Sequence, residues 1–115
     1  MSENSRNIPD PIPMSAIIGG QQYITHSATR IAYHWRPGRA LRYYSTARRI
    51  HLFLTSRGNY FCQEQETEPE SNDAGAFGWT RLVPLSPAEA LRLYLDAYHK
   101  LMERERAFPG IDIEA

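Results

Sequence analysis

The feature that most constrains the fold is an alternating apolar segment that runs into a glycine turn and then returns. Apolar residues alternate along a predicted strand 49–55, and a second predicted strand 60–65 follows the run Ser56-Arg57-Gly58-Asn59. Gly58 can adopt the positive φ that a tight hairpin requires. We therefore predict an antiparallel hairpin with Arg57-Gly58 as its two-residue loop. This register places Leu54 opposite Phe61, Phe53 opposite Cys62, and His51 opposite Glu64.

A helix start is equally well marked further along the chain. Ser86 is a natural N-cap, Pro87 suits the first helical position, and Glu89 completes a Ser-x-x-Glu capping box. The spacing predicts a helix over 87–106 that ends before Pro109-Gly110. Its apolar stripe at helical spacing consists of Leu91, Tyr94, Leu95, Tyr98, Leu101 and Met102.

Three further segments have strand character. Residues 30–36 alternate, with Ile31, Tyr33 and Trp35 on one face and the intervening residues on the other. Segments 21–25 and 79–85 are shorter strand candidates, and 39–46 is a weaker one. Together these elements predict an α+β fold, in which an antiparallel sheet of four to five strands is packed by one C-terminal helix.

A chain of 115 residues is long enough for one small domain. Residues 1–14 contain three prolines within six positions, which disfavours helix and central strand, so we expect a flexible N-terminal arm. Residues 15–108 form the predicted α+β domain. Within it, the acidic residues of 64–78 predict a mobile, solvated loop. Residues 109–115 form a short acidic tail.

The charge is balanced overall but divided along the chain. Lysine plus arginine and aspartate plus glutamate both number 13, yet residues 1–58 carry a net charge of +6 and residues 59–115 a net charge of −6. Twelve of the basic residues are arginine, which binds carboxylates and phosphates through a planar fork. No apolar run is long enough to span a membrane, and the N-terminus lacks a signal-peptide pattern. We therefore expect a cytoplasmic protein without membrane contact.

The sequence predicts no catalytic residue, no metal site and no cofactor. The four histidines lack metal-type pairing, the glycines form no phosphate loop, and one cysteine cannot build a thiolate cluster or a disulfide. Cys62 near His51 across the hairpin is a nucleophile pattern, but a cysteine that follows two aromatic residues in a strand is more typical of a core.

Two groups of residues are candidate binding surfaces. One is basic and aromatic, and combines residue types enriched at protein interfaces; the other is acidic. The first consists of Trp35, Arg36, Arg39, Arg42, Tyr43 and Tyr44, and the second of Glu66, Glu68, Glu70 and Asp73.

These surfaces favour a non-catalytic binding protein with a protein partner. The alternative is single-stranded nucleic-acid binding, with arginines on phosphates and rings on bases, and a small enzyme ranks third. Self-association through an exposed strand edge stays open.

The stretch from Leu54 to Ala90 resembles a pattern found in small uncharacterised proteins of phages, plasmids and integrated elements. In that pattern a hairpin with a Gly-x-Tyr/Phe-Phe return strand leads through a polar loop to a tryptophan and then to a Pro-Leu-Ser-x-x-Glu-Ala helix start. The matching residues here are Leu54-Thr55-Ser56-Arg57-Gly58-Asn59-Tyr60-Phe61, Trp79, and Pro84-Leu85-Ser86-Pro87-Ala88-Glu89-Ala90. The resemblance implies a mobile-element accessory protein that acts on a host or defence complex.

Overall fold

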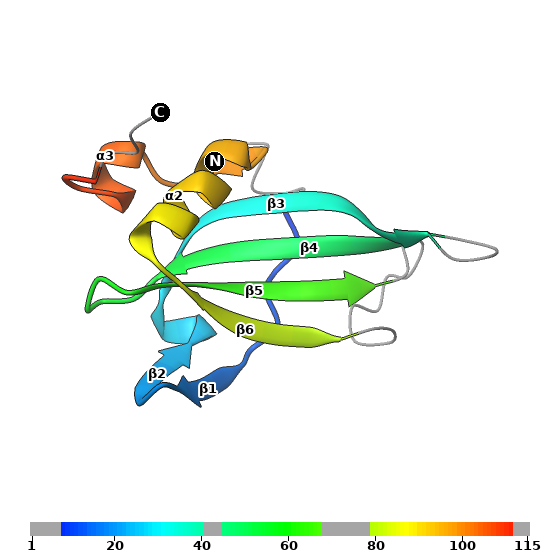
Figure 1. Ribbon diagram of the computed structural model, residues 1–115, viewed down its shortest axis with the longest axis horizontal. Helices are drawn as coiled ribbons and strands as arrows, with labels where there is room; N and C mark the ends of the chain where they lie inside the picture. The colour runs from blue at the N-terminus through cyan, green and yellow to red at the C-terminus, as the bar shows by residue number, and fades with distance from the viewer. Residues whose placement is uncertain (1–7, 41–44, 68–78, 112–115) are drawn as a thin grey trace.

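Five antiparallel strands form the main sheet of the protein, and a separate two-stranded hairpin lies beside it (Figure 1). The computed structural model describes residues 8–40, 45–67 and 79–111. Within them the strand order of the main sheet is β6-β5-β4-β3-β7, and the expected α+β class is confirmed. The elements are β1 (Ser15–Ile18), β2 (Gln21–Ile24), the 3-10 turn η1 (Thr25–Ser27), β3 (Thr29–Ala40), β4 (Ser45–Leu54), β5 (Tyr60–Thr67), β6 (Thr80–Leu85), α2 (Pro87–Asp96), β7 (His99–Lys100) and α3 (Arg104–Ala107).

The predicted hairpin between β4 and β5 is confirmed, but its predicted register is wrong by one residue. The Thr55 amide donates to the Asn59 carbonyl at 2.9 Å, so three residues form the loop instead of two. Gly58 is the last of these three, with a φ of 85°, the position at which a three-residue hairpin loop favours glycine. The resulting partners are Leu54 with Tyr60, Phe53 with Phe61, Leu52 with Cys62, and His51 with Gln63.

The helix begins as predicted but ends ten residues early. The Ser86 hydroxyl accepts a hydrogen bond from the Glu89 amide at 3.1 Å, and the Glu89 carboxylate accepts one from the Ser86 amide at 2.8 Å. The predicted helix over 87–106 is therefore wrong beyond Asp96, where Ala97 is extended with a ψ of 139°.

Tertiary hydrogen bonds explain this early end. His99 and Lys100 pair with β3 as β7, and the Leu101 amide donates to the Ile31 carbonyl at 2.9 Å. The backbone edge of β3 thus gives these residues partners outside a helix. The Tyr94 hydroxyl holds the next segment by donating to the Met102 carbonyl at 2.6 Å.

We call the side of the sheet that carries α2 the front face. Ala32 and Leu52 pack there with Ala90 and Leu91 of the helix. A bulge in β3 between Arg30 and Ala32 brings Ile31 to this side as well, so the predicted strict alternation of residues 30–36 fails at Ile31. The C-terminal residues close the same core, because the Tyr60 hydroxyl donates to the Ala107 carbonyl and its ring stacks on Phe108.

On the back face, the N-terminal segment crosses behind the strands before it reaches β1 (Figure 1). The Gln63 side-chain amide bonds both backbone groups of Ile12, with its Oε1 2.9 Å from the amide nitrogen and its Nε2 2.7 Å from the carbonyl oxygen. Arg30 donates to the Pro9 carbonyl at 2.8 Å, and Ile8 is buried. The expected flexible arm over 1–14 is therefore wrong for residues 8–14, because side chains supply the partners that a proline-rich backbone cannot find in a strand. Residues 1–7 lie outside the described residues.

Two other boundaries also differ. β5 continues to Thr67, so residues 64–67 of the expected mobile loop belong to the sheet, while 68–78 lie outside the described residues. In the expected tail, Ile111 packs against the core on the front face, and 112–115 are not described. No helix in the described part of the chain is both long and apolar enough to cross a membrane.

Candidate binding surface

The helix covers only one end of the front face, and the strands continue beyond it as two rows of mostly polar residues. Each row contains four residues that the strand register places side by side. Three of them lie on β3, β4 and β5, and the fourth lies on β6 or just before it. The row next to the helix-covered core consists of His34, Ile50, Glu64 and Arg81, and the outer row of Arg36, Arg48, Glu66 and Trp79. We call these two rows the open front surface; within them Ile50 and Glu66 are buried, and the remaining residues are partly or largely exposed.

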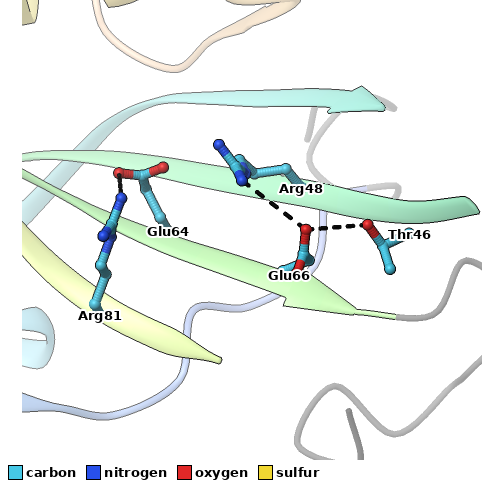
Figure 2. A network of polar contacts seen from close by, with 5 residues as sticks. All are labelled: Thr46, Arg48, Glu64, Glu66 and Arg81. Atoms are coloured by element: carbon cyan, nitrogen blue, oxygen red, sulfur yellow. Dashed lines mark hydrogen bonds and ion pairs between the residues drawn. The ribbon is translucent and has the colours of Figure 1, made fainter. Parts of the chain in front are cut away.

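The carboxylates of this surface are each bound by an arginine (Figure 2). Arg81 Nη2 lies 3.4 Å from Glu64 Oε1, and Arg48 Nη2 lies 3.9 Å from Glu66 Oε2. The Thr46 hydroxyl donates to the same Glu66 oxygen at 3.1 Å. Paired charges of this kind are what a carboxylate requires when it leaves water.

Glu66 therefore does not belong to an exposed acidic surface, which corrects the sequence-based assignment. Its side chain is 1% exposed, because β5 extends through this position and turns the carboxylate toward Arg48. The other three members of the predicted acidic surface (Glu68, Glu70 and Asp73) lie outside the described residues.

Trp79 is held by two guanidinium groups. Arg48 lies 5.2 Å and Arg81 4.7 Å from the centroid of the indole ring. A guanidinium at such a distance is attracted by the negative face of the ring. Arg48 and Arg81 thus connect the Trp79 ring to the carboxylates of Glu66 and Glu64. These contacts with the ring and the carboxylates orient each guanidinium group.

Arg36 and Arg48 are cross-strand neighbours with the same charge. The register places them directly opposite each other on β3 and β4, and Arg36 is exposed. Its positive charge lowers the pKa of His34, after the larger effect of burial, and also acts on Cys62. His34 and Cys62 both lie on the front face. Their response to the charge of Arg36 agrees with the Arg36 side chain also lying on the front face. Within the described segments, Arg36 has no carboxylate partner.

Large apolar side chains are exposed along the outer side of β3. β7 pairs only with Ala32 and Tyr33, so the rest of β3 has no neighbouring strand on this side among the described residues. Trp35 is 44% exposed on the back face, and Tyr98 is 76% exposed on the front. Tyr98 stacks on His34 with ring centroids 5.2 Å apart, and Leu95 is exposed as well.

Of the predicted basic–aromatic surface, Trp35 and Arg36 are described, and both are exposed. The side chain of Arg39 and the whole of Arg42, Tyr43 and Tyr44 lie outside the described residues. Sequence reasoning placed Tyr98 in a buried helical stripe and assigned no site role to Trp79 or Arg81. The cation–π contacts became visible only with the register of β5 and β6.

The buried back face holds a second polar cluster, beneath the N-terminal segment. His51 is fully buried, with its Nδ1 3.4 Å from Arg30 Nη1 and its ring 4.9 Å from that of Tyr33. Burial, together with the positive charges of Arg30 and Arg49, lowers the pKa of His51 to about 3. The imidazole is therefore neutral at physiological pH and closed off from solvent.

The Cys–His pattern noted in the sequence does not form a nucleophilic pair. Cys62 is opposite Leu52, whose side chain faces α2, whereas His51 is the next residue along β4 and faces the back. Burial raises the pKa of the Cys62 thiol to about 12, which suits a core residue and disfavours a reactive thiolate. No group of three or more metal-ligating side chains gathers within the described ranges.

A crevice of about 310 Å³ lies between the β1–β2 turn, η1 and the β4–β5 turn. Its walls carry amide and hydroxyl groups and one charged side chain, Arg57. Asn59 Nδ2 donates to Gln21 Oε1 at 3.4 Å and so connects the two turns. This crevice lies apart from the open front surface and contains none of the predicted site residues.

The structure defines an α+β protein whose five-stranded antiparallel sheet carries one helix over part of its front face. Comparisons with protein-family models, with curated proteins and with solved structures found no match to this chain. The functional argument therefore rests on the surface chemistry described above.

Proposed function

We propose that this chain is a non-catalytic binding protein that docks on another protein through the outer side of β3 and the open front surface. The observation that carries the proposal is the exposure of Trp35 and Tyr98 on the two faces of β3, beside the exposed Arg36. Tryptophan, tyrosine and arginine are the residues that most often dominate the energy of protein interfaces. A partner that covers this edge removes their apolar area from water.

The pairing of the ionisable groups supports a binding function over catalysis. Glu64 and Glu66 are each bound to an arginine, so neither is placed as a free general base. His51 is buried, and the pKa of Cys62 is raised. The resemblance of residues 54–90 to phage and plasmid proteins extends the proposal to an accessory factor that acts on a host complex.

The test is affinity capture from cells that contain the protein, followed by binding measurements with the purified captured partner. The test variant is Trp35→Ala combined with Tyr98→Ala, and the matched control is Ile17→Ala. Ile17 is about as exposed as Tyr98 but lies in the separate β1–β2 hairpin. We expect the wild type and the control to bind alike and the double variant to lose most of the affinity. Equal affinity of the double variant and the wild type would contradict the proposal.

Single-stranded nucleic-acid binding is the second candidate. It is favoured by the exposed Trp35, which lies directly opposite Arg49, so that a ring and a guanidinium are adjacent on the back face. Titration of labelled twelve-nucleotide DNA and RNA at low and moderate salt tests it, because phosphate contacts make affinity strongly dependent on salt. Saturable binding that is lost when Arg36 and Arg39 are both changed to alanine would favour this candidate. Absence of binding at low salt would remove it.

A further inference from the structure

We propose that Arg36 and Arg48 together bind a carboxylate group of the protein partner, so that the partner presents an acidic side chain to the open front surface. This inference rests on the proposed protein-binding function and names the chemistry that the partner must supply. The acidic group would lie between the two guanidinium groups, near the outer edge of β3. Among the described residues, no strand pairs with this edge after Tyr33.

The cross-strand register brings the two arginines together. Residues directly opposite each other in an antiparallel pair have Cβ atoms roughly 4.5–5.5 Å apart, and like charges at that distance destabilise the sheet. An anion between the guanidinium groups reverses the sign of this interaction. The isolated protein therefore carries an unfavourable pair that a negatively charged group relieves.

The existing contacts leave this pair only partly neutralised. Glu66 lies 3.9 Å from Arg48 Nη2, at the limit of an ion pair, and it also accepts the hydrogen bond from Thr46. Arg48 Nε is buried and has no hydrogen-bond partner. The side chain of Arg48 as a whole is still 29% exposed, so part of it is accessible to a ligand. Trp79 fixes that guanidinium in place, which reduces the entropy lost on binding.

The surroundings favour a protein carboxylate over the phosphates of a nucleic acid. Glu64 and Glu66, each paired with an arginine, lie in the same two rows, so this surface lacks the continuous run of unpaired positive charge that a chain of phosphates would require. Trp79 already carries two guanidinium groups, whereas base stacking requires a free ring. A single carboxylate that enters from the β3 side avoids both acids, and Tyr98 is exposed near this entry for apolar contact with the same partner.

The experiment follows the Nε–Hε signals of the arginines by NMR in the full chain during titration with acetylated tetraglutamate. Tetraglutamine is the neutral probe, and inorganic phosphate and an eight-nucleotide oligothymidine are the rival probes. The test variant is Arg36→Gln, and the control is Arg57→Gln, which changes an exposed arginine at the β4–β5 turn. We expect tetraglutamate to shift the Arg36 and Arg48 signals saturably. Arg36→Gln should weaken this binding roughly tenfold, as the loss of a charge-assisted hydrogen bond implies, while Arg57→Gln leaves it unchanged.

The inference would be overturned if tetraglutamate bound Arg36→Gln as tightly as the wild type. It would also be overturned if tetraglutamate shifted the Arg57 signal as much as the signals of Arg36 and Arg48. It also fails if oligothymidine or phosphate binds more tightly than tetraglutamate. A third contrary outcome is self-association in sedimentation that disappears in Arg36→Gln, because it would identify a second copy of this chain as the occupant.

The captured partner separates the two proposals. If Arg36→Gln retains the partner and the Trp35→Ala, Tyr98→Ala variant loses it, the protein-binding function stands and the carboxylate site is wrong. If both variants retain it, both proposals are wrong.

Discussion

Lowering the pH from neutral to 5 should destabilise this protein through the buried His51. In the folded chain, burial beneath the N-terminal segment and the charges of Arg30 and Arg49 lower the pKa of this imidazole to about 3. In the unfolded chain its pKa is near 6.5. Between these two values the unfolded state binds a proton that the folded state does not. The free energy of unfolding therefore decreases as the pH falls from 6.5 toward 3.

The size of the effect follows from the gap between the two pKa values. Each unit of pH within the gap corresponds to about 1.4 kcal/mol. From pH 6.5 to pH 5 the loss is thus about 2 kcal/mol, which is a large fraction of the stability of a small domain. Most surface carboxylates stay ionised over this range, so they contribute little to the slope.

The assay is urea unfolding at pH 7, 6 and 5, followed by the fluorescence of Trp35 and Trp79. The control is His51→Gln, whose amide oxygen can still accept from Arg30 and which does not titrate. This control keeps the contribution of His34, whose pKa is also lowered in the fold, mainly by burial. We expect the wild type to lose about 2 kcal/mol more than the variant between pH 7 and pH 5. Equal losses, or an NMR titration of the folded His51 near pH 6.5, would refute the reasoning.

Three further predictions concern the N-terminal segment, the helix cap and the thiol. Gln63→Ala removes both hydrogen bonds to Ile12, so we expect a loss of about 2 kcal/mol in the free energy of unfolding at about 1 kcal/mol each. Hydrogen exchange of the Ile12 amide should accelerate in this variant, and an unchanged rate would argue against the contact. Ser86→Ala should cost about 1 kcal/mol in urea unfolding, with Ser86→Thr much closer to wild type. Cys62 should react with a thiol reagent at pH 8 only after denaturation, because its raised pKa leaves almost no thiolate in the fold; rapid reaction of the native protein would contradict its burial.

The predictions that succeeded rest on local chemistry. The capping box at Ser86 and the glycine turn at Gly58 each determine a conformation within a few residues, and both form in the structure. The register of the hairpin was wrong because Ser56-Arg57-Gly58 and Arg57-Gly58 are both plausible loops by composition. Only the hydrogen bond between Thr55 and Asn59 distinguishes them.

The features that the sequence did not predict depend on distant partners. The end of α2 at Asp96 depends on the free edge of β3, and the order of residues 8–14 depends on the side chains of Gln63 and Arg30. For the candidate surface, composition singled out Trp35 and Arg36, both exposed in the fold. The burial of Glu66 and its contact with Arg48 required the register of β4 against β5.

The length of the β4–β5 loop has a consequence for how chains of this kind are compared. Because side chains alternate along a strand, closing the turn with Arg57-Gly58 as a two-residue loop would shift the pairing by one residue and exchange the two sides of β5 relative to β4. Phe61 would then lie beneath α2, and Glu66 would move to the side that contacts the N-terminal segment. Two chains that align here without a gap would therefore have inverted interiors if one of them closed this turn with two residues and the other with three.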